Sequence, residues 1–157
     1  MCHYCGCREI PLIKEFIAEH EAVTNAAGDA MRALDAGDLP RVRALVSSMT
    51  DVLLAHWKGE EDGLFAVMSQ DPEYAPYIAD LTLEHRELAA FLADLDLASP
   101  EQVALLRTAV ADLHQHIAKE EDGLFPASLT ALTGDEWDLS IAAWRTAHPG
   151  ARLSPAG

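Results

Sequence analysis

Apolar residues recur along most of the chain at the three- to four-residue spacing of amphipathic helices, and no segment alternates like a β-strand. Four long segments follow this pattern, and each opens beside a proline, a favourable residue in a first helical turn. We expect the first helix to run from near Pro11 to just before Gly37, and the second from near Asp38-Leu39-Pro40 to about Met68. The third should begin after Asp71-Pro72 and end before Ser99, and the fourth should run from Ser99-Pro100 to about Ala127. A shorter fifth helix is predicted from about Asp135 to Ala147.

Short connections between long helices make sequential neighbours antiparallel. The predicted fold class is therefore all-α: an up-down-up-down four-helix bundle with a short additional C-terminal helix. Pro126 should kink the fourth helix or mark an irregularity in it, because proline lacks an amide donor. The expected division is a Cys-rich segment at 1–9, the bundle at 10–132, the short helix at 133–148 and a flexible tail at 149–157.

One segment of the second predicted helix returns sixty positions later in the fourth. HWKGEEDGLF at 56–65 is matched by HIAKEEDGLF at 116–125. Each copy holds a histidine and a glutamate four residues apart, His56 with Glu60 and His116 with Glu120. Residues at this spacing lie on one face of a helix, about one turn apart, so both can reach one metal ion or a pair of ions. The duplication indicates a paired site.

The first and third helices each carry one histidine on the apolar stripe, His20 and His85. A single histidine in such a position is more often a satisfied core residue than a ligand, but here all four helices have one. A buried glutamate costs several kcal/mol unless it is paired or bound to a cation, and Lys58 and Lys119 lie off the relevant face. The sequence therefore predicts one metal site, composed of His20, His56, Glu60, His85, His116 and Glu120.

The other polar residues of the repeat are expected to have different surroundings. By helical phase they turn away from the core, which predicts a solvated acidic face made of Glu61, Asp62, Glu121 and Asp122. Glu61 or Glu121 would replace its neighbour only in a locally unwound helix. His114 is predicted to be exposed, and His148 has no predicted role.

Composition limits the possible partners. The 157 residues, half of them apolar, suit one domain with a core. The net charge of −15, with no dense cluster of Lys or Arg, argues against nucleic acid as a partner. Because no apolar run of about 20 residues and no secretory signal occurs, we expect a cytoplasmic protein that does not enter a membrane.

Three cysteines lie within the first seven residues: Cys2, Cys5 and Cys7. An odd number without a later partner does not suit a disulfide framework, which favours a reducing compartment. These three soft ligands, with His3 beside them, can form a second metal site for zinc, iron or a cluster. Alternatively, the thiols can act as a redox group. The alternative is a terminal segment without a chemical role.

The order of these residues, including EDGLFP at 121–126, resembles the hemerythrin-like (HHE cation-binding) domain over about residues 10–132. The resemblance implies a non-haem di-iron centre in which His20, His56, His85 and His116 are terminal ligands and Glu60 and Glu120 bridge the irons. Oxygen-carrying members have a second histidine on the third helix, four positions after the first. Ala89 stands there, which predicts an open iron position and redox chemistry in place of reversible oxygen carriage.

Three classes of function follow from this resemblance and from the residues. The first is a di-iron protein that binds or reacts with dioxygen, peroxide or nitric oxide, with an electron donor still to be identified. Repair of iron–sulfur clusters is a variant of this class that the cysteines keep open. The second is a module that senses or stores iron or oxygen without turnover. The third is a helical interaction protein with structural histidines.

Overall fold

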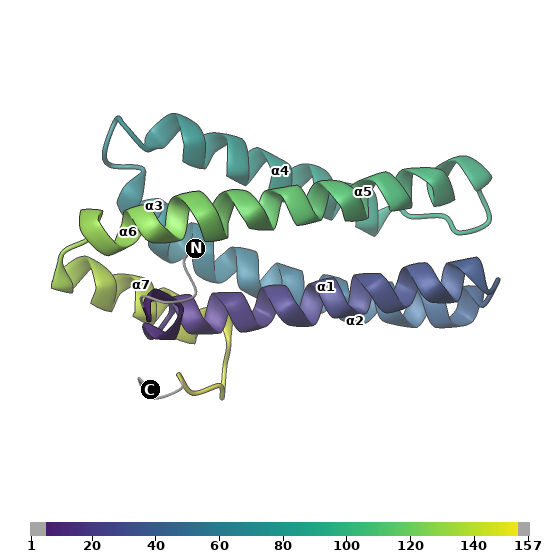
Figure 1. Cartoon of the computed structure of the whole chain (residues 1–157), viewed down its shortest axis with the longest axis horizontal. Helices are drawn as coiled ribbons and strands as arrows, with labels where there is room; N and C mark the ends of the chain where they lie inside the picture. Colours follow the sequence, from purple (N-terminus) through teal and green to yellow (C-terminus); the bar gives the residue numbers. More distant parts are fainter. Residues whose placement is uncertain (1–5, 154–157) are drawn as a thin grey trace.

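The computed structural model describes residues 6–153, and these residues are all-helical apart from turns (Figure 1). Four long helices run along the long axis: α1 (Ile13–Asp35), α2 (Leu39–Gly59), α4 (Ala75–Ala93) and α5 (Pro100–Lys119). Shorter elements gather at one end of them: the 3-10 turn η1 (Cys7–Glu9), α3 (Ala66–Met68), α6 (Phe125–Ala131) and α7 (Gly134–Ala147). The predicted all-helical class is confirmed for the described part of the chain.

The helix starts follow from local hydrogen bonding. The Asp38 side chain accepts a hydrogen bond from the Arg41 amide at 3.1 Å, and Ser99 accepts one from the Gln102 amide at 3.3 Å. At α7, Thr133 and Glu136 form a reciprocal capping box. Each contact satisfies an amide that lacks a partner in the first turn of a helix, so these residues fix where α2, α5 and α7 begin.

Both copies of the sequence repeat contain a π-helical turn, η2 (Glu60–Phe65) and η3 (Glu120–Leu124). The second predicted helix is therefore not a continuous α-helix to Met68. Pro126 lies in the first turn of α6, directly after η3, where an irregularity was expected. Ala66 occupies the matching place after η2, so proline alone does not explain the two turns. Single π turns inside α-helices are frequent at functional sites.

The core consists of two apolar clusters, and the four predicted histidine ligands lie between them. One cluster extends toward the α1–α2 turn and includes Val23, Leu53 and Leu113. The other surrounds the shorter elements and includes Phe16, Leu64, Leu81 and Leu124. On α1 and α4 the histidine separates members of the two clusters. On α2 and α5 the helix itself carries members of the first cluster, and members of the second follow in η2, η3 and α6, so apolar side chains lie on both sides of the histidines.

Within residues 6–153, no helix is both long enough and apolar enough to cross a bilayer.

Candidate metal centre

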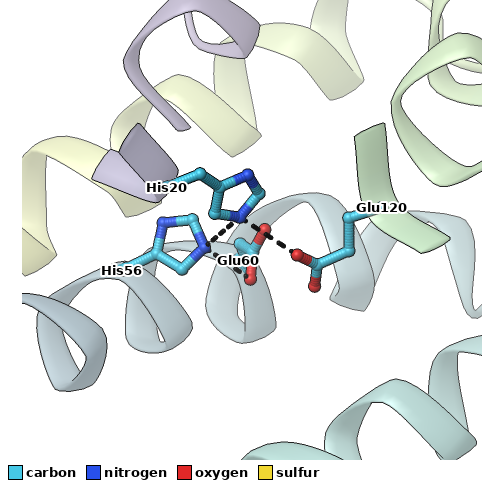
Figure 2. Close-up of side chains that lie close together, drawn as sticks. All are labelled: His20, His56, Glu60 and Glu120. Carbon is cyan, nitrogen blue, oxygen red and sulfur yellow. Dashed lines mark hydrogen bonds and ion pairs between the residues drawn. The ribbon is translucent and has the colours of Figure 1, made fainter. Parts of the chain in front are cut away.

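The structure brings the six predicted site residues together in the interior. The Nε2 atoms of His20 and His56 lie 3.0 Å apart, and those of His85 and His116 lie 2.9 Å apart. The possible ligand atoms form two groups, each within 4.8 Å: His20, His56, Glu60 and Glu120 in one, and His85, His116 and Glu120 in the other. Figure 2 shows the first group, with the imidazoles and carboxylates converging on a common region.

Glu120 belongs to both groups because its two oxygens face different histidine pairs. Oε2 lies 3.1 Å from Nε2 of His20, and Oε1 lies 2.9 Å from Nε2 of His116. A carboxylate held in this way can contact two cations at once, one through each oxygen. It is the first residue of η3, directly after α5.

Glu60 also lies between the two histidine pairs. Its Oε2 lies 3.3 Å from Nε2 of His56 and 3.7 Å from Nε2 of His85. Glu60 and Glu120 are completely buried, and although imidazole nitrogens lie close to them, none of their four carboxylate oxygens has a hydrogen bond of suitable geometry among the described residues. Buried carboxylates need a compensating donor or cation, and imidazole nitrogens with carboxylate oxygens form a suitable ligand set for a transition metal. The residues present therefore fit a pair of metal ions.

The pKa values of the metal-free centre also reflect the burial of several charged groups close together. Burial raises the pKa of Glu60 well above its usual value, and the charge of Glu120 raises it further. Burial also opposes ionisation of Glu120, but the imidazoles of His116 and His20 hold its pKa well below the usual range. Burial lowers the pKa of His56 to about 4, whereas for His20 the carboxylates of Glu120 and Glu121 outweigh burial and raise the pKa to about 9. Protons thus provide only part of the positive charge that two bound cations would supply.

Each of the four histidines has a second carboxylate partner at its other ring nitrogen, Nδ1. The contacts are His56 with Glu19 at 2.7 Å, His116 with Glu84 at 2.7 Å, His20 with Glu121 at 3.0 Å and His85 with Glu61 at 2.9 Å. We call Glu19, Glu61, Glu84 and Glu121 the outer glutamates. An Nδ1–H that donates to a carboxylate fixes the tautomer and the ring orientation, and leaves the Nε2 lone pair directed at the centre.

The solvated face predicted for Glu61 and Glu121 was wrong. An α-helix turns about 100° per residue, so the additional residue of a π turn rotates the following side chains relative to an uninterrupted helix. Glu60 and Glu61, and likewise Glu120 and Glu121, are the first two residues of these turns, and both members of each pair contact histidines of the centre. Asp62 does remain exposed and pairs with Lys58.

Sequence reasoning missed Glu19 and Glu84 altogether. A signal was present, because both residues directly precede a predicted ligand in a repeated Glu-His dipeptide, at 19–20 and 84–85. Lys119, which was expected to lie off the core face, is exposed and pairs with Glu84. His114 is exposed, as predicted, and its ring lies 2.7 Å from the Val110 carbonyl.

Helix α7 covers the side of the centre formed by α1 and α2. The Trp144 indole donates to Oε1 of Glu19 at 2.9 Å, and Nε2 of His148 lies 3.2 Å from the same oxygen. His148, for which no role was predicted, thus contacts an outer glutamate. Close packing requires glycine at position 63, because a Cβ there would lie 3.0 Å from the Cβ of Ala143.

The N-terminal turn reaches the same side through Arg8, whose guanidinium donates to Glu121 at 2.9 Å. Cys7 opens this turn and is half-buried. Cys2 and Cys5 lie outside the described residues, so the possible second site at Cys2, Cys5 and Cys7 stays a prediction.

The side formed by α4 and α5 is more open. A cavity of about 370 Å³ lies between these helices, and its lining includes Trp57, His85 and His116. A smaller hollow of about 260 Å³ is lined by Ala89 together with Trp57, His85 and Glu61. Ala89, which stands where oxygen-carrying members of the family have a second histidine, therefore borders a hollow beside His85.

The family comparison agrees with this geometry. The hemerythrin HHE cation binding domain model matches residues 12–128, about three quarters of the chain. The chain belongs to this family. Searches of curated proteins and of solved structures each found no match. Domains of this family bind metal cations, and the two histidine and glutamate groups of the chain can hold a metal.

Proposed function

We propose that the chain is a non-haem di-iron protein that reacts with dioxygen, peroxide or nitric oxide. One iron would be held by His20 and His56 and the other by His85 and His116, with Glu60 and Glu120 as bridges. The proposal assumes the up-down-up-down order of the long helices, which brings the four histidines to one depth. Its main support is the pair of fully buried glutamates, which lie between two histidine pairs and whose oxygens have no hydrogen bond of suitable geometry within residues 6–153.

The choice of iron rests on the family, because imidazole and carboxylate ligands also suit manganese and zinc. Bound iron would supply one-electron redox chemistry. The bridging carboxylates would balance part of the charge on the ions, and the outer glutamates hold the imidazoles in position. Phe65 and Trp57 stack on His85 at ring distances of 5.5 and 5.0 Å, and Phe125 stacks on His20 at 5.8 Å. These rings restrict water around the ligands.

Anaerobic reconstitution with ferrous iron tests the proposal. We expect about two irons per chain, and an optical spectrum that changes when oxygen or peroxide is added and returns after reduction over repeated cycles. A stable reversible adduct without turnover would instead support sensing or storage, and absence of bound metal would support structural histidines. Restored activity of a damaged iron–sulfur protein, measured separately, would support the repair function.

A matched pair of variants on α5 makes this experiment specific. His116→Ala removes a proposed ligand and should lower the iron content, whereas His114→Ala alters an exposed histidine two residues away and should not. Equal iron content in the two variants would contradict the ligand assignment.

A further inference from the structure

The cavity between α4 and α5 is larger than the proposed oxidants require. A water molecule occupies about 30 Å³ of the liquid, so dioxygen or peroxide would fill only a small part of 370 Å³. The volume lies within the range of about 300–1,000 Å³ that is typical of small-molecule sites. A molecule the size of one aromatic ring with a short substituent fits this space.

Part of the cavity wall is apolar and aromatic. Its walls include Trp57, Leu88, Phe91 and Leu113, and it reaches the imidazole of His116. Trp57 and His116 are both buried, whereas Leu88 and Phe91 are half-buried. Flat apolar walls beside polar groups favour a ring that carries a polar substituent.

The mouth of the cavity is acidic. The exposed Glu87 and Asp112 and the half-buried Glu84 contribute carboxylates, and among the described residues Lys119 is the one Lys or Arg of the lining. The Lys119 ammonium is already paired with Glu84. Negative groups at the mouth disfavour an anionic ligand and can accept hydrogen bonds from a hydroxyl or an ammonium group.

Two residues of the cavity lining differ in character from the residues sixty positions earlier in the first helix pair. Ala109 on α5 corresponds, sixty positions earlier, to Met49, which is buried in the core. Asp112 corresponds in the same way to Val52, which packs against that core. One small and one charged residue thus stand on α5 where α2 has apolar side chains of the core.

We infer that the α4–α5 cavity binds a one-ring aromatic molecule that carries a hydroxyl or ammonium donor and no negative charge. The ring packs against Trp57 and Phe91, and the donor faces the carboxylates at the mouth. The inference extends the proposed function, because the bound molecule lies beside His116, a proposed metal ligand.

Benzyl alcohol, benzylammonium and benzoate test this inference, since they share one ring and differ in charge. Calorimetry on the metal-free protein, repeated on the zinc-loaded protein, should give dissociation constants below about 1 mM for the first two. Benzoate should bind at least about tenfold more weakly. Binding of benzoate as tight as that of benzyl alcohol, or absence of binding by all three, would overturn the inference.

Variants then locate the binding site. Ala109→Met introduces the residue of the first helix pair and should weaken benzyl alcohol at least about tenfold, whereas Ala104→Met on the exposed face of α5 should not. Asp112→Val, an exposed change, should reduce the discrimination against benzoate even if Ala109→Met fails to fold. Unchanged discrimination, or unchanged affinity in folded Ala109→Met, would contradict the inference. Iron content is measured separately, so failure of the proposed function and failure of this inference are distinguishable.

Discussion

The two halves of the centre have the same histidine and glutamate groups but differ in how they are covered. The outer glutamates of the His20–His56 half, Glu19 and Glu121, have side chains that are 15% and 17% exposed. Those of the His85–His116 half, Glu84 and Glu61, are 33% and 34% exposed. A duplicated sequence has therefore produced one enclosed half and one accessible half.

The residues outside the repeat cause this difference. Trp144 and His148 contact Glu19, and Arg8 contacts Glu121, so α7 and the N-terminal turn cover the first half. In the second half Glu84 pairs with Lys119, which is exposed. We expect the first half to hold its metal more firmly and the second half to exchange small ligands more readily.

The largest expected effect comes from the two glutamates that join the halves. Glu60→Ala or Glu120→Ala should remove most of the bound iron from both halves, because each carboxylate lies between the two histidine pairs. Metal analysis after reconstitution gives the stoichiometry, and circular dichroism should show nearly unchanged helix content. Glu21→Ala, an exposed change on α1, is the control. Full loading of both variants would exclude bridging by these residues.

Introducing a ligand in the open half should make the two halves more alike. Ala89→His places an imidazole beside the hollow that Ala89 shares with His85, where it can fill an open metal position. Azide exchange at the iron-loaded centre, followed optically, should slow by about tenfold or more. If the variant binds iron and exchange is unaltered, the open position does not lie at this half.

The contacts of the outer glutamates should differ in strength between the halves. Trp144→Phe keeps the aromatic character but removes the donor to Glu19, the partner of His56. Loss of a direct partner of a ligand typically costs about 10–100-fold in metal affinity, so this change, one contact further out, should cost up to about tenfold. Lys119→Met removes an exposed partner of Glu84 and should change affinity less than about fivefold, because exposed ion pairs contribute about 0–1 kcal/mol. Competition with a chelator measures both. If the two variants lose metal affinity equally, the greater burial of the contacts in the His20–His56 half does not strengthen metal binding there.

Sequence analysis predicted the all-helical class and the family, because apolar periodicity and a repeated histidine and glutamate pair are local signals. It also selected the six residues that the structure brings together. The roles of Glu61 and Glu121 could not be obtained from an uninterrupted helical phase, since both residues lie in π turns. The contacts of Arg8 and Trp144 join residues more than 100 positions apart, and no spacing rule predicts such pairs.

The metal-free protein should be stabilised by removing the charge of Glu60. Because the pKa of Glu60 is raised in the fold, ionisation of the same group in the unfolded chain above about pH 4.5 favours unfolding. Glu60→Gln should therefore raise the melting temperature of the metal-free protein, by about 2–4 °C for each kcal/mol gained. The difference should grow from pH 4.5 toward neutral pH and vanish below it. A constant difference across this range would show that Glu60 does not cause it.

The smallest effect on the metal centre is expected from the cysteines. Changing Cys2, Cys5 and Cys7 together to Ser should preserve folding and iron content, because the six proposed ligands lie between residues 20 and 120 and the N-terminal turn contacts Glu121 through Arg8. Arg8→Met is the matched comparison, and it should weaken the His20–His56 half more than the triple variant does. If the thiols supply electrons, the triple variant should lose sustained turnover with a thiol reductant while a single turnover of the reduced centre survives. Loss of the iron pair itself in the triple variant would place the cysteines within the centre and show that its covered half extends to the N-terminus.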